Sequence, residues 1–258
     1  PFLGRESELD HIQKMLDDPE CRLVSLVGPG GSGKTRLAIQ AAGASLSSPK
    51  HLRFPQGVYF AGLASAASEA DALPVIASAL RFEFRIEIGS SLQFDTAREQ
   101  LANFLAGKKC LLILDNLEQL AGSASLLSRI LLAAPGVKLI VTPRERLNLP
   151  EEWVLEVSGL DFPPEKDAAP GYDLVEIDRY AAVQLFLKGA GRAGQFTPRP
   201  EDWPAIARIV QLVEGIPLGV ELAAAWVKML SCREIADEMS HSLDFLETSR
   251  PDAPERQR

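Results

Sequence analysis

The feature that most constrains this chain is a glycine-rich segment between an apolar run and a helix-forming run. Residues 22–27 read RLVSLV, residues 28–35 read GPGGSGKT, and residues 34–46 have helical composition. The glycine-rich segment fits the pattern GxxxxGK[ST] and lies where that pattern has physical meaning, directly after a strand and at the start of a helix. A chance match somewhere in a chain of ordinary composition is on the order of 1%. The sequence therefore predicts a phosphate-binding loop.

Each residue type in this loop suits phosphate binding. Glycines let the backbone wrap closely, so that successive N–H groups face the β-phosphate, and the helix N-terminus adds partial positive charge. Lys34 is expected to place a cation at the β- and γ-phosphates, and the Thr35 hydroxyl to bind Mg²⁺. The nucleotide-binding residues expected in the loop are Gly28, Pro29, Gly30, Gly31, Ser32, Gly33, Lys34, Thr35 and Arg36.

An acidic residue ends a second buried strand. Residues 111–115 read LLILD, which puts Asp115 at the carboxyl end of the strand, the edge where parallel sheets bind ligands. We expect Asp115 to hold the metal ion together with Thr35. Position 116, where many energetic ATPases carry a catalytic Glu, is Asn116. Glu118 is the nearby acid, and it fits a water-orienting role and a solvated helix-start position equally well. Slow hydrolysis is therefore the expectation.

A further strand end offers groups for a γ-phosphate. Residues 137–142 read VKLIVT and are followed by PRER. Thr142 or Arg144 would reach a γ-phosphate at this edge of the sheet and stabilise its charge. The signal is weak alone, because exposed arginines are common in loops.

Alternating strand and helix patterns predict an α/β fold for residues 1–158. Strands that alternate with helices imply a three-layer domain, with a parallel sheet of about five strands between helices. Apolar β-rich runs occur at residues 22–27, 57–61, 109–114, 137–142 and 153–157, and helical periodicity occurs at 6–16, 34–46, 70–80, 91–105 and 123–134.

The pattern changes after residue 158. Residues 159–176 begin with a stretch holding three prolines and two glycines, which favours a connector. Residues 177–248 show only helical periodicity and predict a small helical lid domain, and residues 249–258 predict a polar linker. The four helices expected in the lid are 177–190, 203–213, 217–230 and 232–246.

Charge and cysteine content argue against several classes of protein. The chain has 27 basic and 35 acidic residues and a formal net charge of −8, which disfavours a surface that coats nucleic acid. Cys21, Cys110 and Cys232 are widely spaced without a CxxC motif, so neither a disulfide framework nor a zinc site is expected. Cys21 and Cys110 flank apolar runs and are expected to be buried. Apolar runs are far shorter than the ~20 residues of a membrane helix. We expect a cytoplasmic protein, cut at both ends from a longer one.

Five motifs in order resemble those of STAND-class signalling NTPases, the group that includes NB-ARC and NACHT proteins. FLGRESEL at residues 2–9 resembles the hhGRExxL adenine-side motif, GPGGSGKT the Walker A motif, and LLILDNLEQL the Walker B form of bacterial regulators with C-terminal repeats. VTPRERL resembles the sensor-1 strand, usually TSRE or TTR, from which Pro143 is a small departure. EGIPLGVELA at residues 214–223 resembles the GxPLAIELAA lid motif. The likeness covers about residues 2–248.

This resemblance implies an AAA+/STAND-type sheet with strand order 5-1-4-3-2, and a switch that is closed with ADP and open and oligomeric with ATP. Arg144 would meet the γ-phosphate. The partners implied are a winged-helix domain after the lid, C-terminal sensor repeats, an N-terminal effector and further copies in the ATP state, without direct nucleic acid or membrane contact by this fragment. The adenine-side residues implied are Phe2, Leu3, Gly4, Arg5, Pro217 and Leu218.

Two other classes stay open beside the ATP/ADP-binding switch with Mg²⁺ and slow hydrolysis. A motor-type AAA+ ATPase acting on DNA or protein needs a catalytic acid beside Asp115 and an arginine finger, and Asn116 argues against it. A P-loop kinase needs a phosphoacceptor pocket and a flexible basic lid, whereas this lid is acidic to neutral with the pattern of a helical bundle.

Overall fold

The computed structural model of the protein describes residues 2–47, 53–85, 94–120, 122–164, 174–194 and 196–242. The chain divides into two compact units. The core unit consists of Ser7–Pro29 and Lys34–Val157, and the helical unit consists of Pro1–Glu6, Gly30–Gly33 and Ser158–Arg258. The sequence led us to expect residues 1–158 in the α/β domain, whereas Pro1–Glu6, Gly30–Gly33 and Ser158 group with the helical unit.

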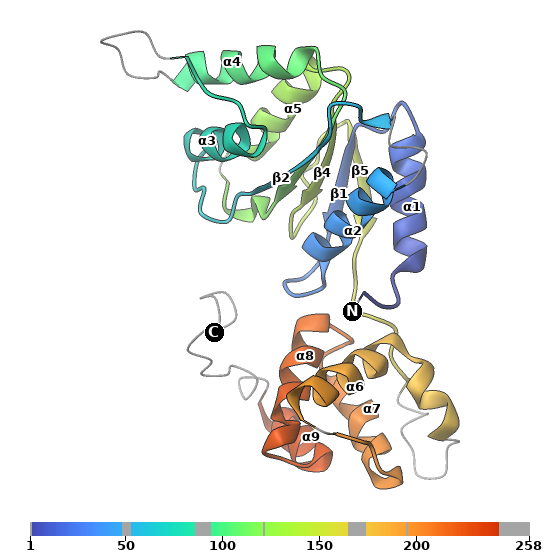
Figure 1. The fold of residues 1–258 in the computed structure, drawn as a ribbon. Helices are drawn as coiled ribbons and strands as arrows, with labels where there is room; N and C mark the ends of the chain where they lie inside the picture. Colours follow the sequence, from blue (N-terminus) through green and yellow to red (C-terminus); the bar gives the residue numbers. More distant parts are fainter. Residues whose placement is uncertain are drawn as a thin grey trace. The chain divides into compact units, whose positions relative to one another are not determined.

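A parallel sheet forms the centre of the core unit (Figure 1). Its strand order, β2-β3-β4-β1-β5, is the expected order counted from the opposite edge, so that prediction is confirmed. Asp115 of β3 lies opposite both Gly62 of β2 and Thr142 of β4, which brings three strand ends to one edge. The strands are β1 (Leu23–Val27), β2 (Val58–Gly62), β3 (Leu111–Asp115), β4 (Lys138–Thr142) and β5 (Glu152–Glu156).

Helices cover both faces of this sheet (Figure 1). α1 packs on α2, where Gln13 Nε2 donates to the Ala41 carbonyl at 2.8 Å. α3, α4 and α5 gather on the other face, over a core that includes Leu112, Leu114 and Val141. Burial on both faces explains why the central strands read as continuous apolar runs. The helices are α1 (Glu6–Asp17), α2 (Lys34–Ser47), α3 (Glu69–Ala79), α4 (Phe94–Ala106) and α5 (Ser123–Ala133).

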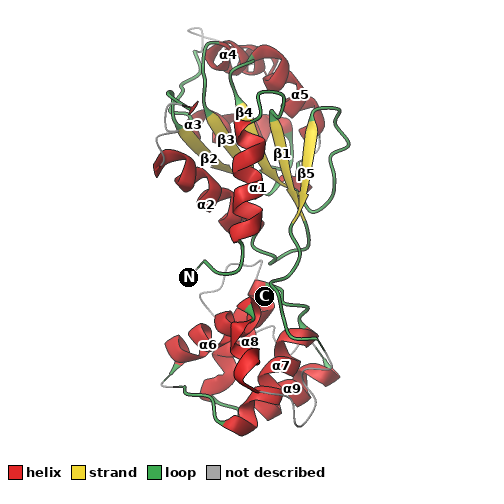
Figure 2. Ribbon diagram, turned by 90° about the vertical axis from the view of Figure 1, so that its right-hand side faces the viewer, coloured by secondary structure: helices red, strands yellow, loops and turns green. Residues whose placement is uncertain are grey.

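The described part of the helical unit contains helices and loops (Figure 2). Its core is formed by buried apolar residues such as Phe186 of α6, Ile206 of α7 and Ile235 of α9. The longer helices are α6 (Ala181–Ala193), α7 (Trp203–Leu212), α8 (Pro217–Ala225) and α9 (Cys232–His241), and the short 3₁₀ helices are η4 (Leu174–Arg179), η5 (Pro200–Asp202) and η6 (Trp226–Lys228).

Three expected helix boundaries in this unit were wrong by four residues or more. The helix expected over 217–230 is α8 followed by the 3₁₀ turn η6, and the first residues of the helix expected over 177–190 belong to η4. The helix expected to end at residue 246 ends at His241, because Ser242 is extended at φ −157°. Apolar spacing alone does not separate an α-helix from a 3₁₀ turn that continues it.

The three cysteines are buried free thiols, which confirms the prediction made for Cys21 and Cys110. Burial raises the pKa of both of these thiols to about 11, and that of Cys232 to about 12. Little reactive thiolate therefore exists at neutral pH. Among the described residues, no helix combines the length and the apolar character that a bilayer span requires.

Gly215 makes a backbone contact within the helical unit that leaves no room for a side chain. The Leu160 N–H donates to the Gly215 carbonyl at 2.8 Å, Gly215 has φ +65°, and a Cβ there would lie 2.1 Å from the Leu160 carbonyl oxygen. Gly215→Ala is therefore expected to lower the free energy of unfolding by about 2 kcal/mol or more, through positive-φ strain and a backbone clash. Urea denaturation measures the change.

Gly191→Ala is the matched control for this prediction. Gly191 lies in α6, and a Cβ there would meet no heavy atom within 4 Å. Its replacement should raise the free energy of unfolding by about 0.5–1 kcal/mol, because glycine is a poor helix former. Equal effects of the two substitutions would contradict the contact described for Gly215.

Candidate functional site

Three hydroxyl and carboxylate groups from separate elements meet at the carboxyl edge of the sheet. Thr35 lies in the first turn of α2, and Asp115 and Thr142 are the last residues of β3 and β4. Asp115 Oδ1 accepts hydrogen bonds from Thr35 Oγ1 at 2.5 Å and from Thr142 Oγ1 at 2.6 Å. The parallel register, which sets Asp115 opposite Thr142, makes the second bond possible.

Thr142 has both of its hydrogen-bonding roles in use. Its side-chain oxygen donates to Asp115 and accepts from the backbone N–H of Asn116 at 2.9 Å, and the residue is buried. Asn116 itself has φ +71°, in the left-handed region. The Thr142 hydroxyl thus fixes the Asp115 carboxylate and the backbone that follows it.

The oxygen donors of Thr35 and Asp115 fit a magnesium ion. Mg²⁺ prefers hard oxygen ligands, and it commonly takes one or two from the protein and the rest from phosphate and water. Within the described ranges no group of three or more His, Cys, Asp and Glu side chains could hold a metal ion. The two oxygens of Thr35 and Asp115 match the small share of ligands that a protein gives to an Mg²⁺ ion held jointly with phosphate.

Lys34 folds back over the phosphate-binding loop. Its Nζ donates to the carbonyl oxygens of Gly28 at 2.7 Å and Pro29 at 2.9 Å. Burial lowers the pKa of Lys34, whereas the negative charge of Glu118 opposes that shift. These contacts hold the Lys34 ammonium group within the loop, where the charges of Glu118, Arg144 and Asp115 act on its pKa.

Glu118 and Arg144 form an ion pair beside this lysine. Glu118 lies in η2 (Leu117–Gln119), the 3₁₀ turn after β3, and its Oε1 is 3.3 Å from Arg144 Nε. Arg144 is 64% exposed, so the pair contributes little to stability. Both charges also act on the pKa of Lys34: Glu118, the candidate for orienting water, raises it, and Arg144, a candidate for the γ-phosphate, lowers it.

The helical unit brings the middle of the loop together with the lid motif. The Leu218 N–H donates to the Gly31 carbonyl at 3.2 Å, and a Cβ at Gly31 would lie 2.7 Å from Leu218 Cβ. Gly33 also faces Pro217: a Cβ atom added to Gly33 would lie 3.9 Å from the Cγ atom of Pro217. Glycine at position 31 thus permits a close approach to the N-terminus of α8.

The N-terminal motif belongs to the same unit. Arg5 is buried, and its guanidinium donates to the carbonyl oxygens of Ser32 and Ser158. Gly4 has φ +63°, and a Cβ there would lie 2.3 Å from Ala181 Cβ of α6, so only glycine fits. The segments for which the resemblance implies an adenine-side position therefore meet Gly31 and Ser32 within the helical unit.

The remaining predicted residues have less specific surroundings. Leu3 packs against the core of the helical unit, Phe2 is half-buried, and Arg36 is exposed on α2. The Ser32 hydroxyl is buried and makes no hydrogen bond with any described residue. A buried hydroxyl normally has a partner, and a phosphate oxygen bound in the loop would provide one.

Sequence reasoning missed two arrangements at this site. Thr142 was named as a possible γ-phosphate group, but its contact with Asp115 follows from strand register, which no local pattern reveals. The Ser158 carbonyl, which accepts from Arg5, carried no sequence signal, because any residue provides a carbonyl group.

Comparisons with known proteins agree with this architecture. A family model described as an AAA ATPase domain matches residues 1–141. A Mycobacterium bovis protein provisionally named an HTH-type transcriptional regulator is 32% identical over 238 residues, which are 92% of this chain and 24% of that protein. An uncharacterized protein of the same organism is 28% identical over 237 residues, which are 91% of this chain and 52% of that protein. The chain thus spans about a quarter and about half of these relatives.

The fold also has a structural relative among solved proteins. The crystal structure of Cdc6p from Pyrobaculum aerophilum matches with a TM-score of 0.58 and 16% sequence identity, covering 93% of this chain and 67% of that one. At this identity the likeness concerns the fold alone: a parallel sheet flanked by helices and followed by further helices.

Proposed function

The chain belongs to the AAA ATPase domain family, and from this premise we propose that it is the ATP/ADP-binding switch module of a longer STAND-type regulator in the cytoplasm. Family membership supports adenine nucleotide binding with Mg²⁺. The relative provisionally named a transcriptional regulator, of which the chain spans 24%, supports a place within a larger protein. The five sequence motifs support the STAND class.

The observation that most supports a switch is the composition of the strand-end cluster. Thr35 and Asp115 offer oxygens for a metal ion, and Thr142 fixes the carboxylate. The next position carries Asn116, whose amide cannot accept a proton as a general base. Such a site binds nucleotide well but hydrolyses it slowly.

In the proposed complex, each group of the site has one role. Lys34 neutralises the β- and γ-phosphates, and Thr35 and Asp115 hold Mg²⁺. When bound, the ion would offset the negative charge of the phosphate groups. Glu118 orients the attacking water. Arg144, which pairs with Glu118 at 3.3 Å, turns to the γ-phosphate when ATP is bound.

The adenine side of the proposed site uses residues of the helical unit. Leu3, Gly4 and Arg5 would lie by the adenine and ribose, and Pro217 and Leu218 would cover the base. ADP then holds the off state, and ATP promotes self-association and signalling through the domains outside this chain. The contacts of Gly31 and Ser32 with Leu218 and Arg5 support this proposal, because within the helical unit they hold these two residues against both adenine-side motifs.

Steady-state turnover of Mg·ATP by the chain tests the proposal. We expect a rate far below the ~10 per second typical of enzymes, because the site lacks a base at position 116. Asn116→Glu should raise the rate if only the base is missing. Asn116→Gln is the matched control, since it introduces the same backbone strain at φ +71° without a carboxylate. Turnover of many per second in the parent chain would favour a motor-type ATPase instead.

A further inference from the structure

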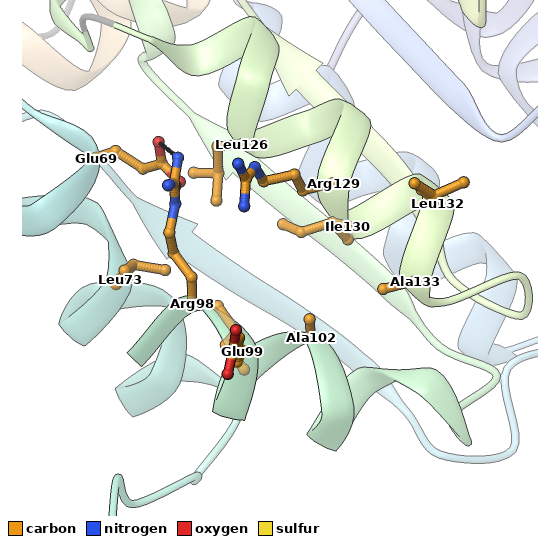
Figure 3. A pocket seen from close by; sticks show the side chains of 11 residues that line it. Glu69, Leu73, Arg98, Glu99, Ala102, Leu126, Arg129, Ile130, Leu132 and Ala133 are labelled. Atoms are coloured by element: carbon orange, nitrogen blue, oxygen red, sulfur yellow. Dashed lines mark hydrogen bonds and ion pairs between the residues drawn. The ribbon is translucent and has the colours of Figure 1, made fainter. Parts of the chain in front are cut away.

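A hollow opens between three helices of the core unit (Figure 3). Its volume is about 210 Å³, and its walls are mostly apolar side chains of α3, α4 and α5. Sites for small organic ligands usually measure roughly 300–1,000 Å³. A hollow of this size therefore suits one or two entering side chains better than a small molecule. The apolar wall residues are Leu73, Leu101, Ala102, Leu126, Ile130 and Ala133.

A buried ion pair closes one end of the hollow. Glu69 Oε1 and Oε2 accept from Arg98 Nε at 2.6 Å and Nη2 at 2.7 Å, and the two side chains are 9% and 16% exposed. Arg98 also approaches Asp95 at 3.4 Å. Each charge of this pair thus has an opposite charge beside it within the core unit. The ion pair holds the Glu69 and Arg98 side chains in place at this end of the hollow.

Two further charges at the hollow lack such partners. Figure 3 shows the Arg129 side chain directed from α5 across the hollow toward Arg98, and Glu99 on the α4 side. Both residues are exposed, and neither makes an ion pair or hydrogen bond with any part of the chain that the structure describes. One acid and one base are therefore available to a molecule that covers the hollow.

Leu132 is a large apolar side chain beside the same hollow. It is 87% exposed, the highest value among the exposed large apolar side chains of the described residues. Isolated exposed leucines are common, but this one adjoins an apolar recess. The α4–α5 face, defined by Glu99, Arg129, Leu132 and the hollow, thus carries both a protruding and a receiving apolar group.

We propose that the α4–α5 face binds a second copy of the chain across a two-fold axis. Leu132 of each copy enters the hollow of the other, and Glu99 of each pairs with Arg129 of the other. A two-fold interface uses one patch twice, so that patch must carry both halves of every contact. This face does: it has a protruding leucine and an apolar recess, one free acid and one free base.

This inference goes beyond the proposed nucleotide switch. The face contains none of the phosphate-loop or strand-end residues, so the association does not depend on nucleotide. A Lys34→Ala chain should dimerise like the parent, whereas ATP-promoted assembly of the switch would be lost in it. The two proposals can therefore fail separately.

Sedimentation velocity over a concentration series without nucleotide tests the face. The parent chain should show a monomer–dimer equilibrium, and Leu132→Asp should raise the dimer dissociation constant tenfold or more, as expected for a central apolar contact. Leu46→Asp is the matched control, because Leu46 is an exposed leucine on α2 outside this face. It should leave the equilibrium unchanged. Circular dichroism verifies that each variant is folded.

A charge exchange gives the sharper readout. Glu99→Arg and Arg129→Glu should each weaken the dimer, because each sets like charges against each other across the axis. The chain carrying both changes should recover much of the parent's affinity, since the opposite charges then face each other again. A parent chain that stays monomeric at every concentration, a dimer insensitive to Leu132→Asp, or a double variant no tighter than the single ones would overturn the proposal.

Discussion

Replacing Lys34 with alanine is expected to lower the affinity of the chain for ATP and ADP by tenfold or more while leaving the fold intact. A single charge-assisted hydrogen bond is worth about 1.5–3 kcal/mol, and 1.4 kcal/mol corresponds to tenfold. Among the described residues, the Nζ atom donates hydrogen bonds to the carbonyl groups of Gly28 and Pro29, so its loss removes no core packing. Titration with a fluorescent ATP analogue measures the effect.

Lys14→Ala serves as the control for this substitution. Lys14 is an exposed lysine of α1 that pairs with Asp10 on the same helix. Its removal changes the net charge by the same amount and should leave nucleotide affinity within experimental error. Unchanged binding in the Lys34 variant would refute the assignment of residues 28–35 as a phosphate-binding loop.

Replacing Asp115 with alanine is expected to remove the Mg²⁺ dependence of ATP binding. The carboxylate is the acidic group of the strand-end cluster, where Thr35 and Thr142 hold its Oδ1 at 2.5 and 2.6 Å. Metal-free ADP should bind nearly as in the parent, because Lys34 and the loop backbone stay in place. Titration of Mg²⁺ at fixed ATP analogue concentration gives the comparison.

Two further variants define the contribution of Asp115. Asp115→Asn keeps acceptor and shape but loses the charge, so it should retain stability while losing most of the Mg²⁺ effect. Asp10→Ala removes an exposed acid of α1 and should leave the Mg²⁺ response as in the parent. If Mg²⁺ still strengthens ATP binding in the Asp115 variants as in the parent, this residue is not the metal-side acid.

The sheet could be predicted from the sequence because its central strands are buried on both faces. The largely apolar runs at residues 109–114 and 137–142 predict two strands, and the structure has β3 and β4 there, with bounds that agree within two residues. The strand order came from resemblance to a family, since hydrophobic patterns do not encode which strands are neighbours. Helix ends were less predictable: the α8-to-η6 transition at Trp226 leaves the apolar spacing unchanged.

The candidate site, too, could be predicted from the sequence only in part. The phosphate-binding loop consists of the consecutive residues 28–35, so its motif could be recognised in the sequence. Asp115 could be recognised because it ends an apolar run. The bonds of Thr142 to Asp115 and of Arg5 to Ser158 join residues 27 and 153 positions apart. Such contacts depend on how strands align and segments pack, which no single stretch of sequence specifies. The α4–α5 face depends on how three helices are spaced in the fold, so it could not be predicted from the sequence either.

Whether this chain binds nucleotide and retains ADP is measured by what stays bound after exposure to Mg·ATP. The chain is incubated with Mg·ATP, separated quickly from free nucleotide and denatured, and the released nucleotide is identified by ion-exchange chromatography. We expect an amount of nucleotide close to equimolar with the chain, converting to ADP that remains bound, and almost none with Lys34→Ala. Release of no nucleotide by the folded parent chain, or repeated rapid consumption of ATP, would contradict it.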